Sequence, residues 1–428
     1  MKKMGKAYDR FCQVKIFFII LITIIPIITQ VSAQQLSANV EQITFGPQNH
    51  FFGYIGHVQT IPWNKSGRYI VSLEVPFRDH MPAPTDAAVI NLIDTKDNYK
   101  LIPVDRTYAW NFQQGTMLYW NPEAPETQFF FNDRDTSNNH VFAVLYDIEK
   151  RKRIREFKFD DTPVGNSGVA QNGGYFLGIN YGRLARLRTV TGYPGAFDWT
   201  TGIQAPDNDG VFLINVNTGG KKLLVSFKQL SEALKNQVPA AAKDELFINH
   251  TLWNREDDLI YFYLRAGYIT REKTVNNPFT IKPDGSELTA HPYYGGHPEW
   301  IENDCIIGSH GKDQIIYSIP EKKIVGKIGT PEILPKTGGD TSLSPDGKWL
   351  AVSLKNDKDG ENIYVVFRRS DMLHVRTPKM PTMEDNNGDL RVDPAPRWNR
   401  TSDALLVPGV VEDGTRQLFI VSIKENLD

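Results

Sequence analysis

The sequence is poor in cysteine and lacks several motifs that mark common enzyme classes. Its 428 residues include two cysteines, Cys12 and Cys305, so a disulfide framework is not expected. It contains no Gly-x-Ser-x-Gly elbow, phosphate-binding loop or dinucleotide fingerprint. Helical periodicity is also rare, and its best example is residues 226–247. These absences argue against serine hydrolases and against enzymes built on nucleotide-binding motifs.

Neither positive nor negative charge is in large excess. The chain has 48 Lys and Arg against 50 Asp and Glu, and no basic stripe is interleaved with aromatic residues. A nucleic-acid ligand is therefore not expected. Five of the basic residues and one acidic residue fall within residues 1–33, which leaves the rest of the chain with a net charge of about −6. An anionic ligand must then be met by a local cluster of Arg and His side chains.

The first 33 residues have the pattern of a signal peptide. A basic start is followed by the apolar run of residues 16–29, and Val31-Ser32-Ala33 has the small-x-small form of a cleavage site. A membrane anchor is the alternative, but the run is shorter than the roughly 20 residues that a spanning helix needs. We therefore expect a secreted or periplasmic protein of residues 34–428, without a membrane span and with Cys305 as its one cysteine.

A short phrase recurs seven times along the chain and predicts its architecture. Each copy is a polar turn, usually opened by Trp, that leads into a run of β-forming residues, and a second strand follows it. The copies begin at Trp63, Trp120, Ala170, Trp253, Trp300, Leu343 and Trp398. Paired repeats of roughly 45–80 residues suit four-stranded blades. We predict one all-β domain, a seven-bladed β-propeller, with its tryptophans packed between blades and an insertion between the third and fourth copies.

The segments that precede the seven phrases are rich in His, Tyr, Arg and Asn, and a propeller brings such segments to the mouth of its central channel. Few carboxylates accompany them. This set of side chains suits β-elimination from a uronic acid, which needs a cation or donor on the carboxylate, a base for the C5 proton and an acid for the oxygen on C4. Asn111, Gln113, His50 and Arg188 are candidates for substrate binding, since Arg offers a fork that fits carboxylate or sulfate.

Several longer strings resemble the seven-bladed propeller lyases that cleave ulvan, and more distantly the oligogalacturonate lyases. These strings are QQGTMLYWNP, FFFNDRD, INYGRLARLR and DLRVDPAPRWNR, and the similarity runs from about Gly46 to Ile423. The resemblance implies a polysaccharide lyase that acts on an anionic, sulfated, uronate-containing polysaccharide and leaves unsaturated uronate ends. It implies no cofactor for catalysis.

Carried over residue by residue, the resemblance assigns the catalytic work to four positions. Tyr119 would transfer the proton, His57 and His80 would face the uronate, and Arg134 would bind the carboxylate or lower the pKa of Tyr119. Tyr181 would line the cleft.

Oligogalacturonate lyases hold a divalent metal through a cluster of histidines on the later blades. Here His250 and His297 remain, with Asp393 as a third candidate ligand, but Ala395 stands where another His would help. A full catalytic metal site is therefore not expected, and a structural zinc or calcium ion stays open.

Three other functions remain open at this point. The protein could be a non-catalytic propeller that binds glycan or protein, an oligogalacturonate-type lyase, or a hydrolase that uses Asp340 and Asp393. Each candidate side chain also has a structural alternative, as a core tyrosine, a buried or solvated histidine, or an arginine paired with a neighbouring aspartate. Convergence of Tyr119, His57 and Arg134 at one channel mouth would favour the lyase, whereas scatter would favour a binding scaffold.

Overall fold

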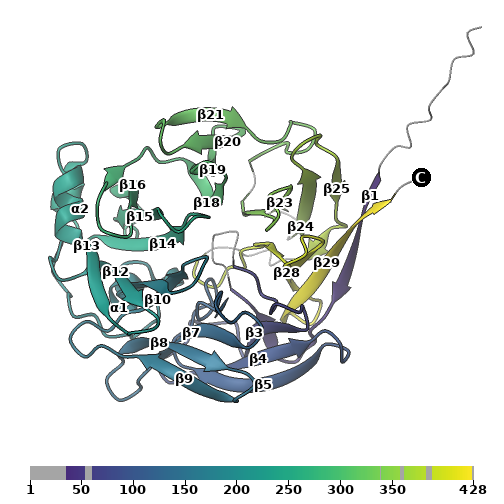
Figure 1. Cartoon of the computed structure of the whole chain (residues 1–428), viewed down its shortest axis with the longest axis horizontal. Helices are drawn as coiled ribbons and strands as arrows, with labels where there is room; N and C mark the ends of the chain where they lie inside the picture. Colours follow the sequence, from purple (N-terminus) through teal and green to yellow (C-terminus); the bar gives the residue numbers. More distant parts are fainter. Residues whose placement is uncertain (1–34, 54–59, 338, 357–360, 382–387, 427–428) are drawn as a thin grey trace, which may run out of the picture.

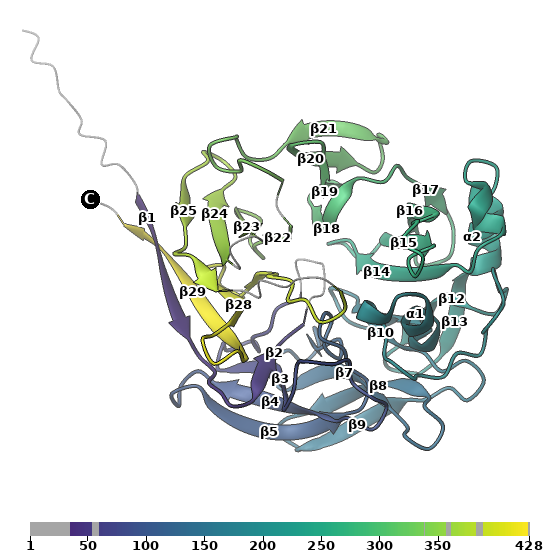
Figure 2. The same cartoon turned by 180° about the vertical axis from the view of Figure 1, so that it is seen from behind.

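Seven antiparallel sheets surround a central axis (Figures 1 and 2). The computed structural model describes residues 35–53, 60–337, 339–356, 361–381 and 388–426. The predicted seven-bladed all-β propeller is confirmed, and each phrase of the sequence repeat supplies the turn between the first and second strands of a blade. The predicted signal peptide lies outside the described residues.

The first four blades follow one another along the chain. Blade 1 contains β2 (Asn49–Phe51), β3 (Tyr69–Val75), β4 (Ala88–Asp94) and β5 (Lys100–Thr107). Blade 2 contains β6 (Tyr119–Trp120), β7 (Gln128–Arg134), β8 (Val141–Asp147) and β9 (Lys152–Phe157). Blade 3 contains β10 (Gly165–Val169), β11 (Tyr175–Ile179), β12 (Gly210–Asn215) and β13 (Lys221–Ser226). Blade 4 contains β14 (Phe247–Trp253), β15 (Ile260–Ala266), β16 (Val275–Ile281) and β17 (Thr289–Ala290).

The last three blades complete the ring. Blade 5 contains β18 (Gly295–Ile301), β19 (Cys305–His310), β20 (Asp313–Ser318) and β21 (Lys323–Lys327). Blade 6 contains β22 (Thr341–Leu343), β23 (Trp349–Asn356), β24 (Glu361–Arg368) and β25 (His374–Arg376), and β26 (Met380–Pro381) also pairs with β24. Blade 7 contains β27 (Arg397–Trp398), β28 (Ala404–Val410), β29 (Arg416–Asn426) and β1 (Gln35–Gln42).

The predicted insertion between the third and fourth phrases contains both α-helices of the described residues. Helix α1 (Tyr181–Leu187) and the 3₁₀ turn η1 (Thr189–Thr191) lie between β11 and β12. Helix α2 (Phe227–Leu234) and η2 (Pro239–Ala242) lie between β13 and β14. A capping box at Ser226 begins α2, in the segment with the strongest helical pattern. None of the helices in the described part of the chain is long and apolar enough to cross a membrane.

The Asn that follows Trp in several phrases explains why the turn recurs. The Asn64 side chain accepts a hydrogen bond from the Tyr69 backbone N–H at 2.9 Å. The Asn254 and Asn399 side chains accept from backbone N–H groups four and five residues further on, at 3.0–3.2 Å. Each amide therefore closes the turn that leads into the second strand of its blade.

The repeated tryptophans join neighbouring blades, as the sequence predicts. They are buried, and four of them donate an indole hydrogen bond to a backbone carbonyl of the preceding blade. The pairs are Trp120 to Pro62 (2.7 Å), Trp253 to Gly168 (3.1 Å), Trp300 to Leu252 (3.3 Å) and Trp398 to Ser342 (3.0 Å). Each indole buries a large apolar ring while its one donor is satisfied, which suits a contact between two sheets.

The ring closes where the two ends of the described chain meet. β1 pairs with β29 over its full length, from Gln35 opposite Asn426 to Gln42 opposite Phe419. Both strands project together from the ring in Figure 1.

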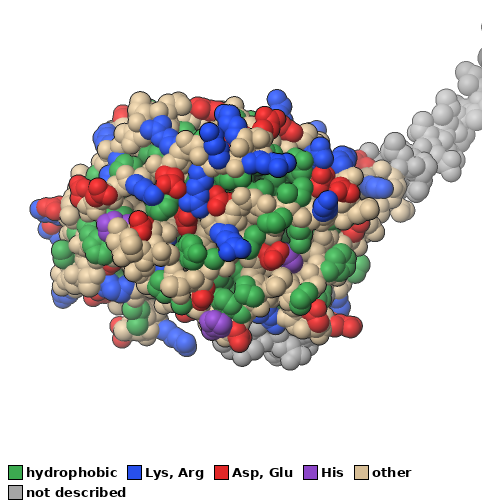
Figure 3. Space-filling model, turned by 90° about the horizontal axis from the view of Figure 1, so that it is seen from below, with side chains coloured by type: hydrophobic (Ala, Val, Ile, Leu, Met, Phe, Trp, Pro, Cys, Tyr) green, Lys and Arg blue, Asp and Glu red, His purple; other side chains and the backbone are tan. Residues whose placement is uncertain are grey.

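The hydrophobic core lies between adjacent blades, where inner and middle strands such as β8 and β15 are buried throughout. Basic and acidic side chains are interspersed on the outer rim seen in Figure 3, so this face presents no field of one sign.

Candidate functional site at the channel mouth

The antiparallel order of the blades brings two kinds of connection to one end of the propeller. These are the connection from the second to the third strand of a blade and the connection into the innermost strand of the next blade. Arg188, Arg265 and Arg391 lie in or beside such connections, and His250 and His297 lie within the innermost strands β14 and β18. The topology therefore places cationic and imidazole groups from blades 3, 4, 5 and 7 at one mouth of the channel.

The two histidines lie side by side because both of their strands are irregular at these residues. The register of β14 shifts between Asn249 and Leu252, and His250 has a left-handed φ of 54°. The register of β18 shifts between Gly295 and Glu299, on either side of His297. Such bulges redirect side chains from the regular alternation of a strand. The ring centroids of His250 and His297 are 5.4 Å apart.

Arginines on aromatic rings surround this histidine pair. The Arg265 guanidinium lies 4.2 Å from the centre of the Tyr263 ring and donates to Asn249 Oδ1 at 3.0 Å. The Arg188 guanidinium lies 4.7 Å from the centre of the Tyr268 ring. Its Nε is buried and has no hydrogen-bond partner among the described residues. Stacking on aromatic faces holds these guanidinium groups in place and leaves donors for a ligand.

Two carboxylates border the cluster. His297 Nδ1 is 2.5 Å from Asp340 Oδ1, and Arg391 Nε is 3.1 Å from Asp393 Oδ1. The Arg391 carbonyl accepts a hydrogen bond from Gln113 Nε2 at 2.6 Å, which joins the segment before blade 2 to the segment before blade 7.

The pKa values of the cluster reflect burial and crowding of positive charge. Burial lowers the pKa of His250 well below 6.5, and the nearby Arg265, His297, Arg188 and Arg391 lower it further. Burial likewise lowers the pKa of Arg188 to about 10, with Arg265 and Arg391 adding to the shift. His250 is therefore neutral at pH 7, and the site favours a negatively charged ligand that would relieve the repulsion.

Asp340 is ionised at pH 7 although it is almost fully buried. Burial alone would raise the pKa of Asp340, but His297, Arg397 and Arg391 together lower it. A glycosidase of the two-carboxylate type needs one carboxyl group that keeps its proton. Asp340 is therefore unsuited to be that acid, and the hydrolase alternative would need Asp393 in that role.

The structure gathers only part of the residue set predicted from the sequence. Arg188, His250 and His297 belong to the channel-mouth cluster. His250 and His297 are neighbours, but no group of three or more His, Cys, Asp or Glu side chains is positioned to hold a metal ion in the described part of the chain. His57 lies outside the described residues.

Tyr119 and Arg134 are both buried in blade 2. Tyr119 is buried in the core that also contains Phe130 and Tyr181. Burial raises the pKa of Tyr119 far above 10, and the cation that opposes this shift is Arg397. Arg134 is buried at the end of β7 and donates to the Pro194 carbonyl at 2.8 Å. The pKa of Tyr119 is shifted upward by desolvation and Arg134 is not among the groups that act on it, so the structure gives no support to the expectation that Arg134 lowers this pKa.

The remaining candidates are held by local contacts. Tyr181 is buried, stacks on Tyr193 at 4.2 Å and donates to the Asn166 carbonyl. His80 is exposed, lies against Phe77 and is 2.7 Å from Asp79.

Two other predicted substrate-binding residues are buried. His50 is 1% exposed in β2, and its nearest acidic group is Glu74 at 4.0 Å. The Asn111 side chain accepts two backbone hydrogen bonds and donates to the Gly192 carbonyl. His50 and Asn111 are therefore surrounded like structural residues, which is the alternative that the sequence analysis left open for each candidate.

Sequence reasoning missed Arg265 and its two tyrosines, Tyr263 and Tyr268. They fall in the run YFYLRAGY, which is typical of a buried strand followed by a turn. The one signal was a charged residue at the end of an apolar strand, where it must find a polar partner or line an opening.

Comparisons with known proteins relate the chain to others by fold alone. No protein-family model matches the sequence, and no curated protein is detectably similar to it. The solved structures include the β-propeller domain of Myceliophteria thermophila Cps50 (Swd1), which aligns with a TM-score of 0.48 and 15% sequence identity. The alignment covers 88% of this chain and 100% of that one.

Proposed function

We propose that the channel mouth binds the carboxylate of a uronic acid unit in a polysaccharide and promotes cleavage of the chain by β-elimination. The observation that supports this proposal is the gathering of Arg188, Arg265, Arg391, His250 and His297 from four blades at one mouth. The three guanidinium groups would neutralise the carboxylate, so that negative charge can develop at C5. Export through the predicted signal peptide belongs to the same proposal, since such polysaccharides lie outside the cell.

The two histidines can divide the proton transfers. His250 is neutral, so its imidazole can accept the C5 proton. His297 Nδ1 lies against Asp340 Oδ1, which orients the imidazole, and His297 would give a proton to the oxygen on C4. The C5–H and C4–O bonds break, a C4=C5 double bond forms, and the released chain end leaves with the proton from His297. Tyr119 and Arg134 are held in blade 2, so we assign these steps to the histidines.

The test is to mix residues 34–428 with ulvan, polygalacturonate and a glycosaminoglycan, and to follow the ultraviolet absorbance of an unsaturated uronate. We expect a rise with at least one polysaccharide, and its loss in His250→Gln and His297→Gln. His374→Gln is the matched control, because His374 is an exposed histidine in β25. Turnover that survives both mouth substitutions would refute the assignment to His250 and His297.

A non-catalytic role in glycan binding is the second candidate. It is favoured by the burial of Tyr119 and Arg134, which are 4% and 3% exposed and so offer little surface to a substrate. Calorimetric binding of a polyuronate without any rise in absorbance would establish this role, whereas absence of binding to all three polysaccharides would overturn both.

A further inference from the structure

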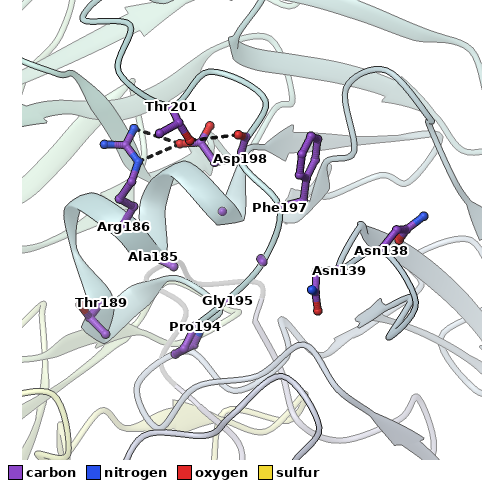
Figure 4. Close-up of a pocket in the computed structure, with 12 residues that line it drawn as sticks. Asn138, Asn139, Ala185, Arg186, Thr189, Pro194, Gly195, Phe197, Asp198 and Thr201 are labelled. Atoms are coloured by element: carbon purple, nitrogen blue, oxygen red, sulfur yellow. Dashed lines mark hydrogen bonds and ion pairs between the residues drawn. The ribbon is translucent and has the colours of Figure 1, made fainter.

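A second cavity opens beside helix α1, apart from the histidine pair. It has a volume of about 560 Å³ and lies between the β7–β8 turn, α1 and the segment of residues 194–201 (Figure 4). Polar side chains and one aromatic ring dominate its lining: Asn138, Asn139, Arg186, Thr189, Phe197 and Thr201. Its size is that of a small-molecule site, which makes it suitable for a sugar unit.

The positive charge in this cavity is fully paired, unlike that at the channel mouth. Arg186 donates to Glu245 at 2.6 Å and forms an ion pair with Asp198 at 2.9 Å. Figure 4 shows Arg186 bonded to Asp198 beside the opening. Asp198 also accepts hydrogen bonds from Asn180 and Thr200. Because two carboxylates share this one arginine, the cavity has no positive charge to spare and favours a neutral ligand over an anion.

The ring of Phe197 provides a surface suited to the apolar face of a sugar. Phe197 is 42% exposed, a large fraction for phenylalanine. Its ring stacks on His140 with centroids 4.8 Å apart, and its backbone N–H donates to the Asn139 carbonyl at 3.0 Å. The ring is therefore held in place while much of it stays open. The electron-rich face of such a ring attracts C–H groups, and neighbouring amides and hydroxyls can bond to sugar hydroxyls.

Helix α1 connects the cavity to the channel mouth. Arg186, in its last turn, lines the cavity, whereas Arg188, its C-cap, belongs to the arginine cluster. Arg134 supports the cavity wall through its hydrogen bond to the carbonyl of Pro194, a lining residue. The two sites therefore share one short helix, and adjacent units of one polysaccharide chain could reach both.

We propose that this cavity is a saccharide subsite that takes a neutral sugar unit next to the acidic unit held at the channel mouth. The inference rests on the proposed function, because it names a second part of the same polysaccharide. It predicts a substrate in which acidic and neutral sugars alternate or adjoin, instead of an unbroken run of uronates.

Calorimetry with two ligands separates this inference from the proposed function. One ligand is an acidic oligosaccharide of alternating uronate and neutral units, and the other is the same oligosaccharide after its carboxylates are reduced to alcohols. We expect the reduced ligand to bind and Phe197→Ala to weaken that binding about tenfold. Arg188→Met should weaken binding of the acidic ligand more than binding of the reduced ligand. Thr201→Trp, which places a bulky ring in the opening, should act as Phe197→Ala does.

The matched control is Tyr175→Ala. Tyr175 is also 42% exposed, but it lies at the start of β11 and does not line the cavity. If the acidic ligand binds and the reduced ligand does not, the neutral subsite is overturned while the channel mouth stands. The subsite is also overturned if Phe197→Ala and Thr201→Trp both bind the reduced ligand normally. If only the reduced ligand binds the wild-type protein, the role of the channel mouth is refuted and the neutral subsite remains.

Discussion

Replacing Glu299 with Gln should change the pH dependence of stability more than any surface substitution. Glu299 lies in β18, is 0% exposed and accepts one hydrogen bond, from the Leu343 backbone N–H at 3.3 Å. Its other carboxyl oxygen is buried without a partner among the described residues. Burial raises the pKa of Glu299 to about 8, although Arg397, the Leu343 N–H and Arg255 oppose the shift. A carboxyl group in these surroundings is held in its protonated form at pH 7.

The sign and size of the effect follow from the difference between the two pKa values. In the unfolded chain the Glu299 side chain titrates near its usual 4.5, and in the folded protein near 8. The folded protein thus binds the proton more tightly. The stability that this proton provides is complete below about pH 4.5 and is lost as the pH rises to 8. The full difference is worth at most about 5 kcal/mol, since each pKa unit corresponds to about 1.4 kcal/mol.

Urea unfolding at several pH values between 5 and 9 measures this contribution. The variant Glu299→Gln keeps the shape of the side chain but cannot ionise. We expect its stability relative to the wild type to rise by several kcal/mol from pH 5 to pH 9. Glu256→Gln, on an exposed turn, is the control and should show no such trend. A wild-type-to-variant difference that stays constant over this range would refute the reasoning, because Glu299 would then ionise alike in both states.

Three further predictions concern the blades and the channel mouth. Trp300→Phe removes the indole hydrogen bond to the Leu252 carbonyl and should lower the free energy of unfolding by about 1–3 kcal/mol. Urea denaturation measures this loss, and an unchanged midpoint would show that the bond contributes nothing to stability. Arg188→Met should weaken polyuronate binding about tenfold to a hundredfold in calorimetry. Arg188→Lys should have an intermediate affinity, because lysine keeps the positive charge but lacks the two-pronged guanidinium group. Equal affinity of the wild type and both variants would contradict an anion site. Because the pKa of His250 is lowered well below 6.5, its neutral form persists on acidification. Any lyase rate that depends on it should therefore stay level from pH 7 to 6.5, and a rate halved at pH 6.5 would exclude His250 as the base.

The blade architecture could be predicted because its determinants are local and repeated. In three of the WN phrases, Asn64, Asn254 and Asn399 bond to backbone groups only four or five residues away, so the turn is encoded within the phrase itself. The tryptophan of the phrase makes a contact at longer range, because its indole N–H donates a hydrogen bond to a backbone carbonyl of the preceding blade. Repetition of one phrase seven times therefore determined the number of blades and the position of their interfaces.

Which residues make up the site depends on contacts between distant parts of the chain, and no local sequence pattern encodes these contacts. Tyr119 stands next to a Trp of the repeat, and only the packing of β6 shows that desolvation dominates its pKa. Arg265 looks like the end of a buried strand, yet its guanidinium lies near Arg188 of the preceding blade. Side chains more than a hundred residues apart, from Arg188 to Arg391, meet because the ring curves through a full circle. The sequence by itself determined the repeated turns, the strands and the blade-to-blade tryptophans. Only the tertiary structure decided which charges face one another at the channel mouth, because burial and long-range proximity control their protonation.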